Sequence, residues 1–307
     1  PHQAPWIRKH EGSRRALEGL AALAIATVPY GIEAKVEADL SQMMAGANEV
    51  LCEAQCALVG GHTSEGAELS LGFAVNGLVD RDAILRKGSL RPGDTLIVTK
   101  PIGTGSLLAA HMRGKAKARW VMQAIAQMTL SNKSAANILR AHCASASTDI
   151  TGFGLLGHLV EMVKAGAVDA TLYLQQVPLL DELEETMAAG IFSSLQPHNV
   201  RLRRAIRNLD VAAAHPLYPI LFDPQTAGGL LASVPSEHAQ ACIGALRAAG
   251  YMFSAIVGHV EPRSVSIAAV VVDVEGVSHE LDASRNVPIQ SLQDQREEFS
   301  DAHQPVL

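Results

Sequence analysis

Helix-like and strand-like segments alternate along this 307-residue chain, and this alternation restricts its fold more than any other feature. Apolar residues recur at steps of three and four across residues 32–56, which predicts an amphipathic helix. Further helices are expected at residues 106–112, 116–128, 134–141, 155–165 and 236–249. Short apolar runs predict strands at residues 69–77, 95–99, 230–234 and 266–274. We therefore expect an α/β (α+β) fold.

Composition and length place the chain among globular proteins with more than one domain. Hydrophobic residues make up 48% of the sequence, too large a share for an intrinsically disordered chain. At roughly 150 residues per domain, the length predicts about two domains. The stretch 80–94 is charged and contains glycine and proline, so it is the best candidate for the linker between them.

The charge balance and the hydropathy pattern exclude some classes of partner. Lys and Arg number 25 against 31 Asp and Glu, a net charge of -6 at pH 7. This acidic balance argues against a general nucleic-acid binder, which usually carries a basic excess. No apolar run reaches the roughly 18 to 20 residues that cross a bilayer. We expect a protein that binds neither nucleic acid nor membrane.

The four cysteines, Cys52, Cys56, Cys143 and Cys242, do not form the dense pattern of a disulfide framework. Cys52 and Cys56 are four residues apart, so they would share one face of any helix that contains both. Burial of both is the favoured interpretation, because free cysteine is usually buried. A metal site would need further Cys or His residues at ligand spacing. Together with the lack of a membrane-spanning run, this cysteine usage predicts a cytoplasmic location.

Residues 60–66 read Gly-Gly-His-Thr-Ser-Glu-Gly and are expected to form a loop between two strands. Paired glycines let a backbone approach a ligand closely, and the hydroxyl and imidazole groups can then bind ligand oxygens. A tight turn with exposed polar groups explains the segment equally well.

Residues 148–154 read Thr-Asp-Ile-Thr-Gly-Phe-Gly and precede a predicted helix. Asp149 in this position suits Mg²⁺, which is usually held by one or two carboxylates together with phosphate oxygens. The N-terminus of the helix would favour a phosphate in addition. The alternative is that Asp149, Thr148 or Thr151 only caps the helix or turn. His158, one turn into the helix, is favoured as a packed or surface histidine over a ligand.

Residues 222–231 read Phe-Asp-Pro-Gln-Thr-Ala-Gly-Gly-Leu-Leu. Asp-Pro begins a turn, and Gly-Gly enters the predicted strand that follows. The favoured interpretation is a structural loop that supports the sheet of its domain.

Together with residues 99–105 (Thr-Lys-Pro-Ile-Gly-Thr-Gly), these three segments resemble the selenophosphate synthetase (selenide, water dikinase) family of the aminoimidazole-ribonucleotide-synthetase-like superfamily. The resemblance covers roughly residues 22–274, and the order and spacing of all four segments carry it. It implies a two-domain fold. Residues 22–90 would be the C-terminal part of an N-terminal ATP-binding and dimerisation domain, and 91–275 a C-terminal α/β domain. An unmatched head, 1–21, and a polar tail, 276–307, would flank them.

The resemblance also implies an activity, which is ATP-dependent synthesis of selenophosphate from selenide and water, with AMP and phosphate as products and Mg²⁺ assisting. It implies a homodimer with the ATP site near the dimer interface. Gly61, His62 and Thr63 align with a family loop that reaches ATP across that interface, and Asp149 aligns with a metal-ligand aspartate. Lys100 lies in a family motif without an implied role, and a surface position is favoured for it.

One departure from the family concerns catalysis itself. Members carry a reactive Cys or selenocysteine and a catalytic Lys upstream of the matching region, and no residue of this sequence corresponds to either. We therefore assign no catalytic residue and expect a truncated N-terminal domain and a chain that is inactive alone. Two alternatives stay open. One is a non-catalytic dimerising or nucleotide-binding remnant, and the other is a different ATP-dependent enzyme of the superfamily acting on a small phosphate or nucleotide.

Overall fold

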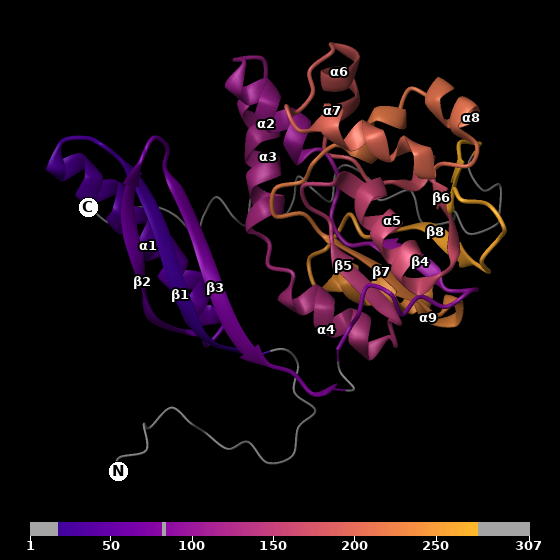
Figure 1. The fold of residues 1–307 in the computed structure, drawn as a ribbon, viewed down its shortest axis with the longest axis horizontal. Coiled ribbons are helices and arrows are strands. Elements are labelled where there is room, and N and C mark those ends of the chain that lie inside the picture. Colours follow the sequence, from indigo (N-terminus) through magenta and orange to yellow (C-terminus); the bar gives the residue numbers. More distant parts are fainter. Residues whose placement is uncertain (1–17, 82–83, 276–307) are drawn as a thin grey trace.

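The computed structural model describes residues 18–81 and 84–275, which form two units (Figure 1). The first unit is a three-stranded sheet with strand order β2-β1-β3 and one long helix. The central strand β1 (Glu18–Pro29) pairs in parallel with β2 (Ala57–Gly66) and antiparallel with β3 (Ser70–Leu78). Helix α1 (Glu33–Glu53) connects β1 to β2, because two parallel strands need a crossover between them.

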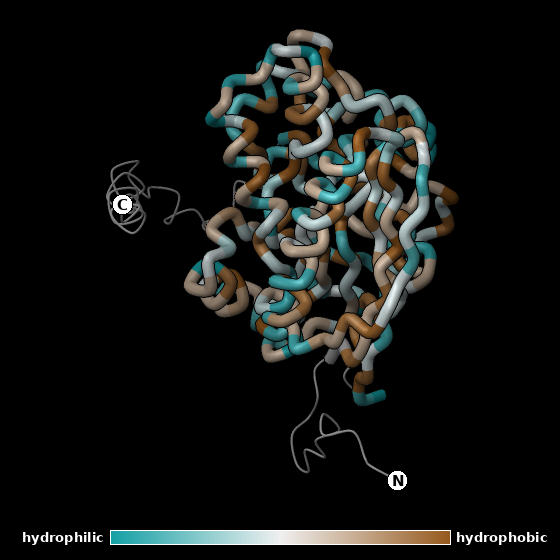
Figure 2. The backbone as a smooth tube through the Cα atoms, turned by 90° about the vertical axis from the view of Figure 1, so that its left-hand side faces the viewer, coloured by the Kyte–Doolittle hydropathy of each residue, from teal (hydrophilic) through white to brown (hydrophobic). Residues whose placement is uncertain are grey.

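The two faces of this small sheet differ in burial. Along β1, the small residues Ala22, Ala24 and Ala26 are buried, whereas the alternate residues Leu23 and Ile25 are 42% and 55% exposed. Side chains alternate between the faces of a strand, so α1 covers the alanine face over β1 and β2 and the leucine–isoleucine face is open. Figure 2 views this unit from outside and shows hydrophobic positions among the strands that face the reader.

The predicted helix over 32–56 is confirmed as α1, although one residue of the predicted apolar face does not pack against the sheet. Val36, Leu40, Met43 and Leu51 are half-buried, whereas Val50 is 63% exposed. The helix ends before Cys56, so Cys52 and Cys56 do not share a helical face. Cys56 is buried but Cys52 is exposed, and the prediction that both are buried is wrong for Cys52.

The second unit is built on a six-stranded sheet with strand order β5-β7-β4-β8-β6-β9. All neighbouring pairs are antiparallel except β6 and β9. The strands are β4 (Thr95–Val98), β5 (Ala146–Asp149), β6 (Asp169–Tyr173), β7 (Leu230–Val234), β8 (Ala255–Glu261) and β9 (Val270–Asp273). The predicted strand over 230–234 is confirmed as β7 without a change of bounds.

Helices cover both faces of this sheet (Figure 1). The longer ones are α2 (Thr104–Met112), α3 (Ala118–Thr129), α4 (Lys133–Ala141), α5 (Gly154–Gly166) and α9 (Ser236–Ala248). Shorter ones are α6 (Leu183–Ala188), α7 (Gln196–Asn199) and α8 (Leu209–Ala214), with 3-10 turns at Leu174–Gln176, Val200–Ala205 and Tyr218–Phe222.

Two hydrophobic cores lie on the two faces of the large sheet. On one face, Ile97 of β4 packs in a cluster with Leu139 of α4 and Leu246 of α9. On the other face, Leu96 and Val98 join a larger cluster that includes most of α5. The sheet is therefore held as a rigid layer, and the loops at its edges are fixed at both ends.

Residues 60–66 form part of strand β2, so the expected loop is wrong. Their register runs continuously along β1, from Leu23 opposite Gly60 to Pro29 opposite Gly66. The segment has few apolar side chains, but a strand needs only a partner for its backbone N–H and C=O groups. None of the helices among the described residues is long and apolar enough to cross a membrane. The predicted tail, 276–307, and most of the predicted head lie outside the described residues.

Candidate functional site

Three of the four motif segments meet at one edge of the large sheet. Strand β7 runs antiparallel to both β4 and β5, so its start lies beside the ends of those two strands. The Thr99 N–H donates to the Leu230 carbonyl at 3.0 Å, and the Ile150 N–H donates to the Gly229 carbonyl at 2.8 Å. Loops 99–105, 149–154 and 223–229 thus lie side by side as a consequence of strand order.

Asp223 and Gln225 join two of these loops through buried hydrogen bonds. The Ser106 hydroxyl donates to the Asp223 carboxylate at 2.6 Å, and the Gln225 amide nitrogen donates to it at 2.9 Å. The Gln225 amide oxygen accepts from the Gly103 N–H at 3.0 Å and from the Thr104 hydroxyl at 3.1 Å. These groups cap the start of α2. Asp223 and Gln225 therefore have a structural role, which agrees with the favoured interpretation of residues 222–231.

Burial determines the protonation behaviour of Asp223. Its side chain is fully buried, and desolvation raises the pKa of Asp223 to about 6. Hydrogen bonds from Ser106, Gln225 and the Gly105 backbone favour the charged form and oppose this rise. A carboxylate that accepts from so many donors is anchored in place.

Asp149 lies at the end of β5, and its side chain is exposed at the edge where the loops meet. Apart from the adjacent Thr148 hydroxyl at 3.5 Å, no described hydrogen bond or ion pair engages its carboxylate. Nor do the described residues contain any group of three or more His, Cys, Asp or Glu that could hold a metal ion. One free carboxylate fits Mg²⁺ in the common case where phosphate oxygens and water complete the coordination.

His158 is buried next to the loop that follows Asp149, with 4% of its surface exposed. Its Nε2 atom accepts a hydrogen bond from the Thr151 N–H at 3.0 Å, so this nitrogen carries no proton. Burial lowers the pKa of His158, with the Glu161 carboxylate opposing the shift. His158 is thus a packed histidine, which agrees with the interpretation favoured from the sequence.

Gly61, His62 and Thr63 lie in the other unit, on β2, and all three are exposed. A Cβ atom at position 61 would lie 2.1 Å from the Ala24 carbonyl oxygen, so glycine is needed for strand pairing. His62 is opposite Ile25 in the register and therefore lies on the open face of the small sheet. No hydrogen bond or ion pair in the described part of the chain joins these three residues to Asp149.

Lys100 is buried, and the prediction of a surface lysine is wrong. Its side chain is 2% exposed, and its Nζ donates to the carbonyls of Leu130 at 2.5 Å and Ala227 at 3.2 Å. The chain turns inward after β4 and packs against loop 223–229, where a Cβ atom on Gly229 would be 2.6 Å from the Lys100 backbone nitrogen. Asn132 was not singled out in the sequence, because its partner, Gly228, is 96 residues away in the chain.

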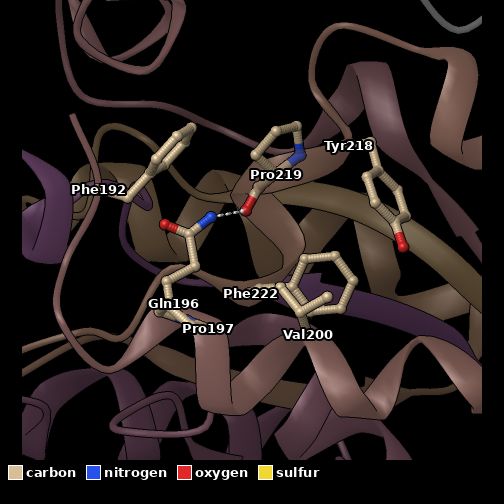
Figure 3. Close-up of a pocket in the computed structure, with 7 residues that line it drawn as sticks. All are labelled: Phe192, Gln196, Pro197, Val200, Tyr218, Pro219 and Phe222. Carbon is tan, nitrogen blue, oxygen red and sulfur yellow. Dashed lines mark hydrogen bonds between the residues drawn. The ribbon is translucent and has the colours of Figure 1, made fainter. Parts of the chain in front are cut away.

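A separate apolar pocket of about 430 Å³ lies beside Phe222, where the segment 222–231 begins (Figure 3). Two of its side chains carry polar groups, Gln196 and Tyr218, and Gln196 donates from its amide nitrogen to the Pro219 carbonyl at 3.0 Å. No charged group lines it, so it does not suit a phosphate. The lining residues are Phe192, Gln196, Pro197, Val200, Tyr218, Pro219 and Phe222.

Comparison with protein-family models gives two matches along the chain. The AIR synthase related protein, N-terminal domain, matches residues 16–79. The AIR synthase related protein, C-terminal domain, matches residues 91–271. The two matched regions correspond to the two structural units.

Curated relatives carry the name selenide, water dikinase. The protein of Trichlorobacter lovleyi is 39% identical over 229 residues, which is 73% of this chain and 64% of that protein. The protein of Geobacter metallireducens is 38% identical over 74% of this chain and 66% of its own length. The protein of Pelobacter propionicus is 36% identical over 80% of this chain and 70% of its own length. The chain thus spans roughly two thirds of these relatives.

Solved structures of lower identity share the fold. The hydrogenase maturation protein HypE has a TM-score of 0.65 at 16% identity, covering 84% of this chain and 74% of that one. Thiamine monophosphate kinase from Aquifex aeolicus has a TM-score of 0.56 at 18% identity, covering 85% and 75%. At such identities the likeness shows the fold alone.

Proposed function

The chain belongs to the selenide, water dikinase family of the AIR synthase related proteins, and from this premise we propose that it takes part in ATP-dependent synthesis of selenophosphate. The substrates would be ATP, selenide and water, and the products selenophosphate, AMP and phosphate. The observation that supports this proposal most directly is the exposed Asp149 carboxylate at the sheet edge where three motif loops meet.

Phosphoryl transfer suits such a site, because it asks the protein for positioning and charge neutralisation more than for covalent chemistry. In this proposal Asp149 holds Mg²⁺, and Gly61, His62 and Thr63 contact the nucleotide. When bound, Mg²⁺ would neutralise charge on the phosphate oxygens. His158 keeps the Asp149 loop in place through its bond to the Thr151 N–H.

A selenide-dependent assay of AMP formation from ATP tests the reaction. AMP that appears only when both selenide and Mg²⁺ are present would support the proposal. ATP turnover without selenide, on a small phosphate or nucleotide substrate, would support a different enzyme of the superfamily. ATP binding without any turnover, both in this chain and in a chain extended upstream with the family's Cys and Lys segment, would support the non-catalytic alternative.

Asp149→Asn tests the proposed metal ligand. We expect the Mg²⁺ concentration needed for half-maximal ATP binding to rise about tenfold or more, because the amide carries no negative charge. Calorimetric titration of ATP at several Mg²⁺ concentrations measures this shift. The fold should be intact, because the Asp149 side chain is exposed. Asp210→Asn, at an exposed position on α8, is the matched control. An unchanged Mg²⁺ dependence in Asp149→Asn would refute the assignment.

We further propose that the chain forms a homodimer through the open face of the small sheet. Leu23 and Ile25 are exposed there, and exposed apolar side chains on an open sheet face favour a protein contact. His62 lies on the same face, which would bring the proposed nucleotide contact close to the interface.

Ile25→Glu is expected to convert this dimer to a monomer, because it places a charge in the apolar interface. Sedimentation analysis at micromolar concentration measures the change. Val50→Glu, on an exposed position of α1, should leave the dimer intact. A wild-type protein that sediments as a monomer would rule the interface out.

A further inference from the structure

Lys100 presents a buried ammonium group without a carboxylate partner. It is the largest of the fully buried side chains, and none of the ion pairs within residues 18–81 and 84–275 includes it. Both of its acceptors are backbone carbonyls, those of Leu130 and Ala227. A buried charge is costly unless something compensates it, so this arrangement calls for an explanation.

The two acceptors belong to segments far apart in the sequence. Leu130 directly follows α3, where the carbonyl end of a helix favours a cation. Ala227 has φ 48°, a left-handed conformation that residues other than glycine rarely adopt. Such a conformation persists only where its surroundings hold it.

A second bond runs parallel to the first. The Asn132 side-chain nitrogen donates to the Gly228 carbonyl at 2.9 Å. The segment that carries Asn132 is itself fixed, since the Tyr251 hydroxyl donates to the Ser131 carbonyl at 2.6 Å. Two consecutive carbonyls of the motif loop are thus bound by side chains of a rigid support.

Because the peptide group is planar, the direction of each bound carbonyl also fixes the direction of the N–H group of the next residue. In a trans peptide the N–H points opposite to the C=O, and the described residues contain no cis peptide bond. With the Ala227 carbonyl bound to Lys100, the Gly228 N–H points away from Lys100. By the same reasoning, because the Gly228 carbonyl is bound to Asn132, the Gly229 N–H points away from Asn132. Successive N–H groups beside a left-handed residue form a concavity that binds anions.

We propose that Lys100 is a positioning residue that, with Asn132, orients the Gly228 and Gly229 N–H groups toward a phosphate group of the nucleotide. The ligand class rests on the proposed function, whereas the positioning does not. Thr226 and Ala227 of the same loop are exposed, whereas Gly228 and Gly229 themselves are buried. Their loop reaches the same sheet edge as Asp149.

The protonation of Lys100 offers a readout that a purely structural lysine would not supply. Burial lowers the pKa of Lys100 to about 8, and no charged group contributes to this shift. An anionic phosphate nearby would favour the ammonium form. Affinity for ATP should therefore decline as the pH rises through about 8.

The test compares Lys100→Met, Lys100→Arg and the control Lys133→Met, which changes an exposed lysine at the start of α4. Met keeps the length of the side chain but has no donor, whereas Arg keeps charge and donors. Hydrogen exchange without nucleotide should accelerate about tenfold at residues 226–229 in Lys100→Met only. Calorimetry with Mg-ATP should show about tenfold weaker binding in that variant, with partial recovery in Lys100→Arg.

The pH profile separates positioning from simple packing. Wild-type affinity should fall between about pH 7 and pH 9, and the profile of Lys100→Met should be flat. Wild-type exchange and wild-type affinity in Lys100→Met would overturn the proposal. If that variant does not fold, a wild-type affinity that is constant across this range would overturn it instead. A wild-type protein that binds no Mg-ATP refutes the nucleotide as ligand, while the exchange comparison still decides the positioning role.

Discussion

Asp223→Ala is expected to lower the free energy of unfolding by about 3–5 kcal/mol, the range for breaking a buried charged network by removing one partner. The carboxylate accepts hydrogen bonds from Ser106, from Gln225 and from the backbone of Gly105, and it is fully buried. Alanine would leave these donors without an acceptor at the start of α2. Urea denaturation followed by circular dichroism measures the loss.

Asp210→Ala is the matched control, because Asp210 is exposed on α8 and should change the stability by less than about 0.5 kcal/mol. A loss below about 1 kcal/mol for Asp223→Ala would contradict the role of this carboxylate as the anchor of the two loops.

The pH dependence checks the same group. Its folded pKa of about 6 lies above the ordinary value of 3.8, so the folded state binds this proton more tightly than the unfolded state. The resulting stabilisation is fully present below pH 3.8 and is lost as the pH rises through 6. Between about pH 5 and pH 7 the loss should be about 1.4 kcal/mol. Asp223→Asn, which cannot ionise, should lack this slope.

The regular elements with strong periodicity could be predicted from the sequence. Helix α1 repeats its apolar residues at helical spacing over 21 residues, and β7 is a short apolar run between turn signals. Strand β5 reads Ala-Ser-Thr-Asp and carries no such signal. It is a strand because β7 supplies hydrogen bonds along its length, and that neighbour comes 81 residues later in the chain, from Asp149 to Leu230.

The residues of the candidate site likewise divide into those that the sequence could identify and those that it could not. Asp149 could be singled out because an aspartate in a glycine-containing loop before a helix is a local pattern. Lys100 could not be placed correctly, because its two acceptors, Leu130 and Ala227, lie 30 and 127 residues away. A lysine after a strand is usually at the surface, and only tertiary structure supplies the carbonyls that make burial possible.

Gly228→Ala is the second change with a large expected effect. A Cβ atom there would lie 2.2 Å from the Ile150 carbonyl oxygen and 2.9 Å from the Gln225 Cβ. The oxygen belongs to backbone that pairs at the edge of the sheet, so no flexible side chain can move aside. We expect a loss of about 3 kcal/mol in the free energy of unfolding, at the upper end for overpacking.

The same change should also abolish Mg-ATP binding, because Gly228 of loop 223–229 lies against Ile150 of loop 149–154. To relieve the clash, the two loops must separate, which moves Asp149 and the Gly228 N–H apart. Gly152→Ala is the matched control, because a Cβ atom there meets nothing within 4 Å. Calorimetry and urea denaturation on both variants decide the question. If Gly228→Ala and Gly152→Ala proved equally stable, the close approach of the two loops would be wrong. If Gly228→Ala lost stability but bound Mg-ATP normally, the loops would pack as described, and the nucleotide would not depend on their alignment.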